Sequence, residues 1–303
     1  MVRYTVAVCN YNMAETLERS LESILGQLTP EFEVLVVDGG SDDGSVSLLR
    51  DLQERHETLR VVELDADPER HLGRDRQIAV ERARGDYVLP QLDADDVYDD
   101  CIRDFVSVYH AFEAGFDGPL YLNGQGLNIA PASLLERIPY RNLPTSEDRD
   151  LWRRLLADDA MLRLEHGSVR ESIGYERSVV DEMRYRDFAG KVADAQCGVT
   201  LTSCLKWAAT APTSPLERSR PPLTHAMKRG YDCLTFLLAY PVAASRESFP
   251  TPTPVRDRAE FDRRLRRVQA TAAEHESRLG VTVDRSSLGE AGETAFFGRR
   301  GDA

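Results

Sequence analysis

The sequence predicts an α/β protein with a doubly wound, mostly parallel sheet that has helices on both faces, followed by a mainly helical C-terminal extension. Two observations carry this prediction. Short apolar runs alternate with amphipathic stretches through the first hundred residues, an order typical of a parallel sheet covered by helices. From about residue 211 the chain gains prolines and loses strand-like runs, which favours a separate extension over 211–303.

The first part of the chain predicts four strands separated by three helices. The run FEVLVV is typical of a buried strand, and ETLERSLESILGQ repeats leucine and isoleucine at helical spacing. Acidic and glycine residues follow several of the strands. The expected strands are Tyr4–Val8, Phe32–Val37, Leu59–Leu64 and Tyr87–Leu92, and the expected helices are Glu15–Gln27, Ser45–His56 and Arg74–Arg84.

The remainder predicts fewer strands and more helix. Tyr98–Ala114 and Arg149–Leu156 have helical patterns, and Leu120–Ile129 has strand-like and glycine-rich pieces. Glu260–Leu279 predicts a polar helix, and a disordered tail is expected from about residue 286. We therefore expect one domain over 1–210, made of halves 1–96 and 97–210, and an extension over 211–303.

Composition excludes several classes of protein. A net charge of −13 leaves no basic surface to neutralise phosphates, which argues against a nucleic-acid partner. Five cysteines without a CxxC pair indicate reduced thiols in a cytoplasmic protein. We expect no signal peptide at the N-terminus, and the longest apolar run, Cys233–Ala244, is shorter than the roughly 20 residues that span a bilayer.

Three acidic clusters are candidates for chemistry. Asp38-Gly39-Gly40-Ser41-Asp42-Asp43-Gly44 follows the second strand, and its carboxylate could accept a hydrogen bond from a base or ribose. The glycines would let the backbone approach a ligand closely. The alternative is a common Asp/Gly loop that caps the next helix.

The second cluster, Asp93-Ala94-Asp95-Asp96, ends the fourth strand. Ligands of α/β sheets bind at this end of the strands. Carboxylates this close together suit Mg²⁺ or Mn²⁺, which leave positions free for phosphate oxygens. The alternative is a solvated acidic turn that caps a helix.

The third cluster, Glu147-Asp148, opens the helix that carries Trp152. A helix N-terminus favours an ionised carboxylate, which suits a base that deprotonates an acceptor. Plain helix capping is the alternative for Asp148.

In this order and spacing, the clusters resemble family 2 glycosyltransferases with the GT-A fold, over roughly residues 4–165. Val6-Ala7-Val8-Cys9-Asn10-Tyr11-Asn12 stands where the family has an apolar strand followed by Pro-Thr-Tyr-Asn. Residues 38–44 match its Asp-Asp-Gly-Ser-x-Asp-Gly turn, and Asp93–Asp96 match its Asp-x-Asp-Asp site. Arg76 lies on the matching helix, and Glu147-Asp148 matches the acceptor-side motif. Departures exist: Cys9-Asn10 replace Pro-Thr, Ala79 stands where glycine is common, and Pro90-Gln91 add one residue to the fourth strand.

The resemblance implies an inverting transfer of sugar from a nucleotide-diphosphate sugar, with UDP-sugars favoured, to a hydroxyl of a glycan or lipid-linked saccharide. Residues 1–96 would then bind the donor and 97–210 the acceptor. Asp148 would be the catalytic base, with Glu147 and Trp152 in the acceptor site. Asp95 and Asp93 would hold Mn²⁺ or Mg²⁺, with His166 a further candidate ligand that could equally be structural. The donor-binding residues implied are Asn10, Tyr11, Asn12, Asp38, Gly40, Arg76, Asp93, Ala94 and Asp95.

Two questions stay open from the sequence. Residues 223–244 could lie on the cytoplasmic face of the cell membrane near a lipid-linked acceptor, or could form a helix packed on the core. The competing functions are a nucleotidyltransferase and a non-catalytic nucleotide-sugar scaffold or sensor. The loop after the first strand is not the glycine-rich, basic loop of a nucleotidyltransferase, and a dehydrogenase is excluded because G-x-G-x-x-G is missing there.

Overall fold

The computed structural model describes residues 1–174, 187–210, 222–249 and 251–298. The chain divides into two compact units. The sheet unit comprises Met1–Tyr140, Ala160–Tyr175 and Arg267–Ala303, and the helical unit comprises Arg141–Asp159 and Glu176–Arg266. This division differs from the boundary expected near residue 210, because the last stretch of the chain groups with the sheet unit.

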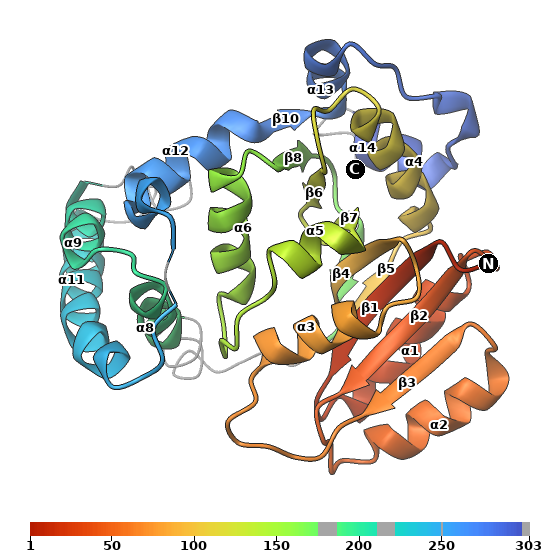
Figure 1. Cartoon of the computed structure of the whole chain (residues 1–303), viewed down its shortest axis with the longest axis horizontal. Coiled ribbons are helices and arrows are strands. Elements are labelled where there is room, and N and C mark those ends of the chain that lie inside the picture. Colours follow the sequence, from red (N-terminus) through yellow and green to blue (C-terminus); the bar gives the residue numbers. More distant parts are fainter. Residues whose placement is uncertain (175–186, 211–221, 250, 299–303) are drawn as a thin grey trace. The chain divides into compact units, whose positions relative to one another are not determined.

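The sheet unit contains an eight-stranded sheet in the order β10-β8-β6-β7-β4-β1-β2-β3, whose consecutive strands β3, β2, β1 and β4 can be followed in Figure 1. Its strands pair in parallel except where β7 pairs antiparallel with β4 and β6. The mostly parallel sheet predicted from the sequence is therefore confirmed. The strands are β1 Tyr4–Asn10, β2 Phe32–Asp38, β3 Leu59–Glu63, β4 Tyr87–Asp93, β6 Tyr121–Gly124, β7 Leu127–Pro131, β8 Met161–Glu165 and β10 Gln269–Thr271.

Helices cover both faces of this sheet. One core joins the side chains of Val6, Val8, Val34 and Val36 to apolar residues of α1 (Ala14–Leu25), α2 (Ser45–Arg55) and α4 (Ile102–Glu113). Because successive residues of a strand point to opposite faces, the residues between these valines face the other side, where α3 (Leu72–Arg82) packs on β1, β2 and β4. Beyond β7, α5 spans Ala132–Arg137, and a two-stranded sheet pairs β5 (Asp96–Tyr98) with β9 (Arg170–Ser172).

Strand β4 contains the extra residue that the sequence indicates at Pro90-Gln91. Val6 pairs with Leu89 and Val8 pairs with Leu92, so two residues of β4 lie opposite one residue of β1. Gln91 has a φ of 70°, and its Oε1 accepts hydrogen bonds from Tyr121 and Asn128 at 3.2 and 2.8 Å. A bulge accommodates a proline in a central strand, and beyond it Asp93 lies in register with Cys9.

The C-terminal stretch differs from its prediction in two ways. The helix expected over Glu260–Leu279 is divided into α12 (Arg258–Val268) and α13 (Ala272–Leu279) by β10, which pairs with β8. The expectation of disorder from about residue 286 is wrong for α14 (Glu290–Phe297), whose Phe296 is buried against Phe105 with ring centroids 5.8 Å apart. A short 3-10 turn at Arg285–Ser287 precedes α14.

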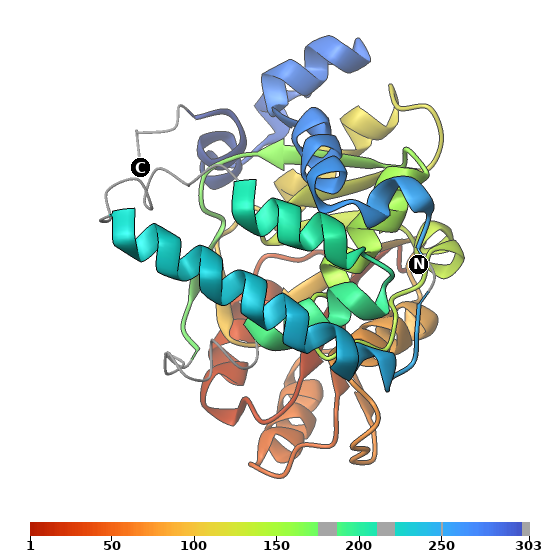
Figure 2. The same ribbon diagram turned by 90° about the vertical axis from the view of Figure 1, so that its left-hand side faces the viewer.

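The helical unit is built from α6 (Glu147–Ala157), α8 (Ala189–Gln196), α9 (Leu201–Thr210) and α11 (Pro222–Ala244), followed by a 3-10 turn at Thr253–Arg256. Figure 2 shows α11 as a long helix beside α9, and it also packs on α8. The buried Asp194 pairs with Arg153 at 2.8 Å and with Arg258 at 2.9 Å. Among the described residues, no helix has the length and apolar character needed to span a membrane.

Candidate functional site

The first two acidic clusters lie at one edge of the sheet. Asn10 ends β1, Asp38 ends β2 and Asp93 ends β4. Asn10 is in register with Asp38, and Cys9 is in register with Asp93. Because β1 runs parallel to both neighbours, the structure brings these clusters together at the carboxyl ends of three adjacent strands.

Asp38 shapes the loop that follows β2. Its side chain is fully buried, and the backbone N–H groups of Gly40 and Ser41 donate to Oδ1 at 3.0 and 2.9 Å. Asn10 Nδ2 and Ser41 Oγ donate to Oδ2, both at 2.7 Å. A carboxylate accepts about four hydrogen bonds, so this one is satisfied within the chain. Direct contact with a base, predicted for Asp38, would require an exposure that this side chain lacks.

The same loop is tied to the loop after β1. The backbone N–H of Asn12 donates to Ser41 Oγ at 2.9 Å, and Asn12 Oδ1 accepts from the N–H of Asp42 at 2.9 Å. Gly40 has a φ of 90°, and a Cβ there would lie 2.6 Å from the backbone nitrogen of Ala66. Glycine is therefore required at residue 40 by backbone packing. Tyr11 remains 59% exposed, which leaves its ring available to a ligand.

A pair that the sequence analysis did not single out borders this loop. Arg70 Nε donates to Asp75 Oδ1 at 2.7 Å, and Arg70 Nη2 donates to the carbonyl oxygen of Gly39 at 2.8 Å. Burial raises the pKa of Asp75, although Arg70 partly offsets that rise. The only sequence signal was an acidic residue in the first turn of α3, which ordinarily indicates helix stabilisation.

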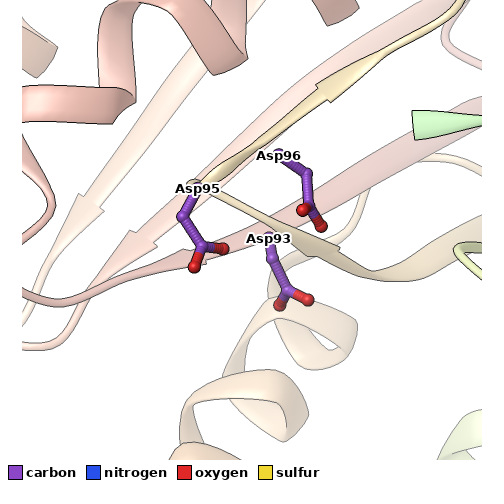
Figure 3. A group of neighbouring side chains, drawn as sticks. All are labelled: Asp93, Asp95 and Asp96. Atoms are coloured by element: carbon purple, nitrogen blue, oxygen red, sulfur yellow. The ribbon is translucent and has the colours of Figure 1, made fainter. Parts of the chain in front are cut away.

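Asp93, Asp95 and Asp96 form the acidic cluster. One carboxylate oxygen from each residue lies within 4.8 Å of the others. Figure 3 shows the three side chains, which come from the end of β4, the turn after it and the start of β5. Ala94 between them is buried. Oxygen donors at this spacing fit a hard divalent cation such as Mg²⁺ or Mn²⁺.

Two arginines compensate part of this negative charge. Arg76 Nη2 lies 3.1 Å from Asp93 Oδ1, and Arg170 Nη1 lies 3.5 Å from Asp93 Oδ2 and also contacts the carboxylate of Asp96. No lysine or arginine of the described residues pairs with Asp95. Asp95 is therefore the member of the cluster best placed to bind a cation. Arg170 was missed because β9 follows β8 far along the chain and has no motif of its own.

Neighbouring polar groups hold Asp93 in place. Its backbone N–H donates to the hydroxyl of Tyr98 at 2.9 Å, and its carbonyl accepts from Ser20 Oγ at 3.1 Å. Burial raises the pKa of Tyr98, so its hydroxyl stays neutral and can serve as acceptor and donor. The cluster is thus fixed by its backbone as well as by its ion pairs.

His166 does not join this cluster. Its Nδ1 lies 2.5 Å from the carbonyl oxygen of Gly167, and its Nε2 lies 2.7 Å from that of Gly124. Its ring also meets that of Phe296 edge to face at 5.4 Å. A histidine needs a free ring nitrogen to bind a metal, so this geometry favours the structural role over the ligand role.

The third cluster belongs to the helical unit. Asp148 and Glu147 lie in the first turn of α6, and Asp148 Oδ1 accepts from the backbone N–H of Arg149 at 2.6 Å. Glu147 is buried and Trp152 is half-buried. The helix dipole stabilises an ionised carboxylate here. Asp148 and the Asp93–Asp96 cluster belong to different units, so their convergence on one substrate stays a prediction.

Comparison with known proteins decides the family. Residues 5–161 match the sequence profile described as Glycosyl transferase family 2. The chain belongs to this family. The putative teichuronic acid biosynthesis glycosyltransferase TuaG of Bacillus subtilis is 34% identical over 92 residues, which are 30% of this chain and 35% of TuaG. The succinoglycan biosynthesis protein ExoO of Rhizobium meliloti is 27% identical over 187 residues, covering 60% of this chain and 50% of ExoO. The chain thus spans half or less of these two curated relatives.

Solved structures support the fold. S. aureus TarS 1–349 in complex with UDP-GlcNAc has a TM-score of 0.55 at 16% identity, covering 92% of this chain and 93% of that one. Glucosyl-3-phosphoglycerate synthase from Mycobacterium tuberculosis, in complex with Mn²⁺ and UDP, has a TM-score of 0.52 at 17% identity, covering 66% and 81%. The family and the GT-A fold that the sequence indicates are both confirmed.

Proposed function

We propose that this chain transfers a sugar from a nucleotide-diphosphate sugar, with UDP-sugars favoured, to a hydroxyl of a glycan or lipid-linked saccharide, with inversion at the anomeric carbon. The observation that carries the proposal is the Asp93-Asp95-Asp96 cluster, at the strand edge where the β1 and β2 loops meet. TarS and the mycobacterial synthase, with which this chain shares its fold, were solved with UDP-GlcNAc and with UDP and Mn²⁺.

The donor would bind in the sheet unit. The exposed ring of Tyr11 offers a surface for a base, and Asn12 and Gly40 fix the loop around it. Arg76 and Arg170 border the cluster and supply positive charge toward the diphosphate. Asp38 and Asn10 would act indirectly, by holding these loops in shape.

Asp95, with Asp93, would hold Mn²⁺ or Mg²⁺. When bound, such an ion neutralises the negative charge that the leaving diphosphate develops. Arg170 already pairs with Asp93 and Asp96, so the carboxylate of Asp95 would carry most of the metal affinity.

Asp148 would act as the base of the transfer. The acceptor oxygen forms a bond to the anomeric carbon while the bond from that carbon to the diphosphate oxygen breaks on the opposite face. The hydroxyl proton passes to Asp148, and the electron pair leaves with the diphosphate. A base positioned in this way contributes about 10²–10⁴-fold in rate. Glu147 and Trp152, from the same helix, would border the acceptor.

Helix α11 supports a peripheral membrane contact on the cytoplasmic face. Its inner side packs through the fully buried Phe236 and Ala239, whereas large apolar residues remain exposed. These are Leu223, Met227, Leu234, Leu237 and Leu238. The segment can therefore both pack on the protein, through its buried side, and contact a membrane, through its exposed side. Co-sedimentation with anionic vesicles tests the contact, and protein that stays in the supernatant would contradict it.

A donor screen tests the proposed function. Purified protein is incubated with UDP-, GDP- and dTDP-sugars, with Mn²⁺ or with EDTA, and release of the nucleoside diphosphate is measured. We expect release from UDP-sugars with Mn²⁺, loss of release with EDTA, and strong loss in Asp95→Ala. Asp51→Ala, on the exposed surface of α2, removes the same charge and should behave as wild type. Absence of release and of nucleotide binding across the panel would overturn the proposal.

A further inference from the structure

The loop after β2 departs from the family pattern at one position. Where that pattern has two consecutive aspartates before Gly-Ser, this chain has Asp38 followed by Gly39. Asp38 is buried and satisfied within the loop. Residue 39 therefore offers no side chain, and the buried carboxylate of Asp38 is already occupied by the hydrogen bonds of its own loop.

A carboxylate from another element occupies the place of the missing side chain. A Cβ built on Gly39 would lie 3.1 Å from Asp75 Oδ2 and 3.5 Å from Cδ2 of Tyr11. The φ of Gly39 is not positive, so its backbone conformation does not require glycine. Asp75, from the first turn of α3, thus lies where an acidic side chain at residue 39 would extend.

Arg70 fixes Asp75 against the loop. It donates to Asp75 Oδ1 at 2.7 Å and to the carbonyl oxygen of Gly39 at 2.8 Å. One guanidinium therefore links Asp75 to the loop after β2. No described residue donates a hydrogen bond to Oδ2, the oxygen nearest Gly39. Asp75 therefore keeps one acceptor oxygen next to the exposed ring of Tyr11.

An acceptor beside an aromatic ring is suited to reading a base, because the ring can stack while the carboxylate meets the edge of the base. A carboxylate only accepts hydrogen bonds. The pairing edge of uracil presents a ring N–H, whereas cytosine presents an unprotonated ring nitrogen at the same position. We propose that Asp75 reads the base of the donor in this chain, accepting the uracil ring N–H in place of the side chain missing at residue 39. This inference rests on the proposed function.

A compensating exchange tests the inference. Binding of UDP and of CDP, each with Mn²⁺, is measured by calorimetry for wild type and four variants. These are Asp75→Ala, Asp75→Asn, Gly39→Asp with Asp75→Ala, and the charge-matched control Asp51→Ala. Asp75→Ala should weaken UDP binding about 10- to 100-fold, the range for a hydrogen bond to a charged group. The double variant should recover most of this loss, because the new carboxylate arises from the loop at the same place.

The ratio of UDP to CDP affinity separates reading of the base from mere support of the loop. Asp75→Asn keeps the shape of the side chain and adds an N–H donor, so this ratio should fall while the melting temperature changes little. Equal loss of UDP and CDP affinity without recovery in the double variant would overturn the inference, as would unchanged UDP binding in Asp75→Ala. Wild-type protein that binds no nucleoside diphosphate would instead overturn the proposed function.

Discussion

Aspartate residues have different roles within the candidate site. Asp38 is fully buried and accepts hydrogen bonds from its own loop and from Asn10 at the end of β1. Asp95, in the turn just after β4, is half-buried and has no ion pair with a described residue. Local sequence places both after apolar strands and so predicts both as ligand-facing. Only the three-dimensional hydrogen-bond partners separate the residue that shapes the loop from the residue that can bind a ligand.

The role proposed for Asp148 can be tested at the scale of the single residue. Asparagine preserves its size and its hydrogen bond from the N–H of Arg149 but cannot take a proton. We expect Asp148→Asn to lower turnover about 10²–10⁴-fold and to leave the affinity for UDP within about twofold of wild type. Turnover with a radiolabelled donor and calorimetric binding provide the two measurements.

Two further aspartates, one on α6 and one just after it, serve as controls for this variant. Asp159, exposed just after α6, should tolerate Asn without loss of turnover. Asp150 is buried and accepts from Arg141 at 3.0 Å and from Arg154 at 2.6 Å, so Asp150→Asn should destabilise the protein. Near-normal transfer by Asp148→Asn would refute its assignment as the base.

At the scale of the element, sequence periodicity predicts elements whose buried face is set by local packing, but not those that form only by pairing with a distant strand. The leucines and isoleucine that repeat at helical spacing in α1 are all buried, namely Leu17, Leu21, Ile24 and Leu25. The bulge in β4 was also visible, because Pro90 in a central strand conflicts with a regular ladder. By contrast, β10 is only Gln-Ala-Thr, which has no strand pattern and exists because it pairs with β8.

Strand β2 contains a buried charge whose effect on stability depends on pH. Glu33 accepts hydrogen bonds from Thr5 at 2.8 Å, from the N–H of Arg84 at 2.7 Å and from Arg60 at 3.1 Å. Burial opposes ionisation, but these hydrogen bonds outweigh it and lower the pKa of Glu33. Because the folded pKa lies below the ordinary value of about 4.3, its stabilisation is fully present above that pH and disappears as pH falls through the folded pKa.

Glu33→Gln should therefore lower the free energy of unfolding of the sheet unit by about 2 kcal/mol at pH 7. Urea unfolding at pH 7 and at pH 3.5 measures the difference. The difference in the free energy of unfolding between wild type and variant should narrow at the lower pH, since Glu33 of the unfolded chain is then increasingly protonated. Glu54→Gln, exposed on α2, should have the free energy of unfolding of wild type at both pH values. A gap that stays constant or widens on acidification would contradict the assignment.

At the scale of the whole molecule, the sequence predicted the fold of the part covered by the family profile. It did not predict that the last stretch of the chain belongs to the sheet unit. The family profile covers residues 5–161, where strand ends and motifs are close in sequence. Beyond it, β10 and α14 complete the sheet unit after the helical unit has intervened. Those contacts join residues more than a hundred positions apart, and local composition carries no record of such pairing.

The last helix should therefore support the fold of the sheet unit. Asp104 of α4 accepts the backbone N–H of Gly289 at 3.0 Å, at the start of α14, and Phe296 is buried against Phe105. Removing a buried phenylalanine side chain costs about 3–5 kcal/mol, so Phe296→Ala should lower the melting temperature and increase hydrogen exchange in α4. Phe297→Ala, at a half-buried neighbour, should have a clearly smaller effect. If 211–303 were instead an independent extension, exchange in α4 would be unchanged by Phe296→Ala, and that result would restore the division expected from the sequence.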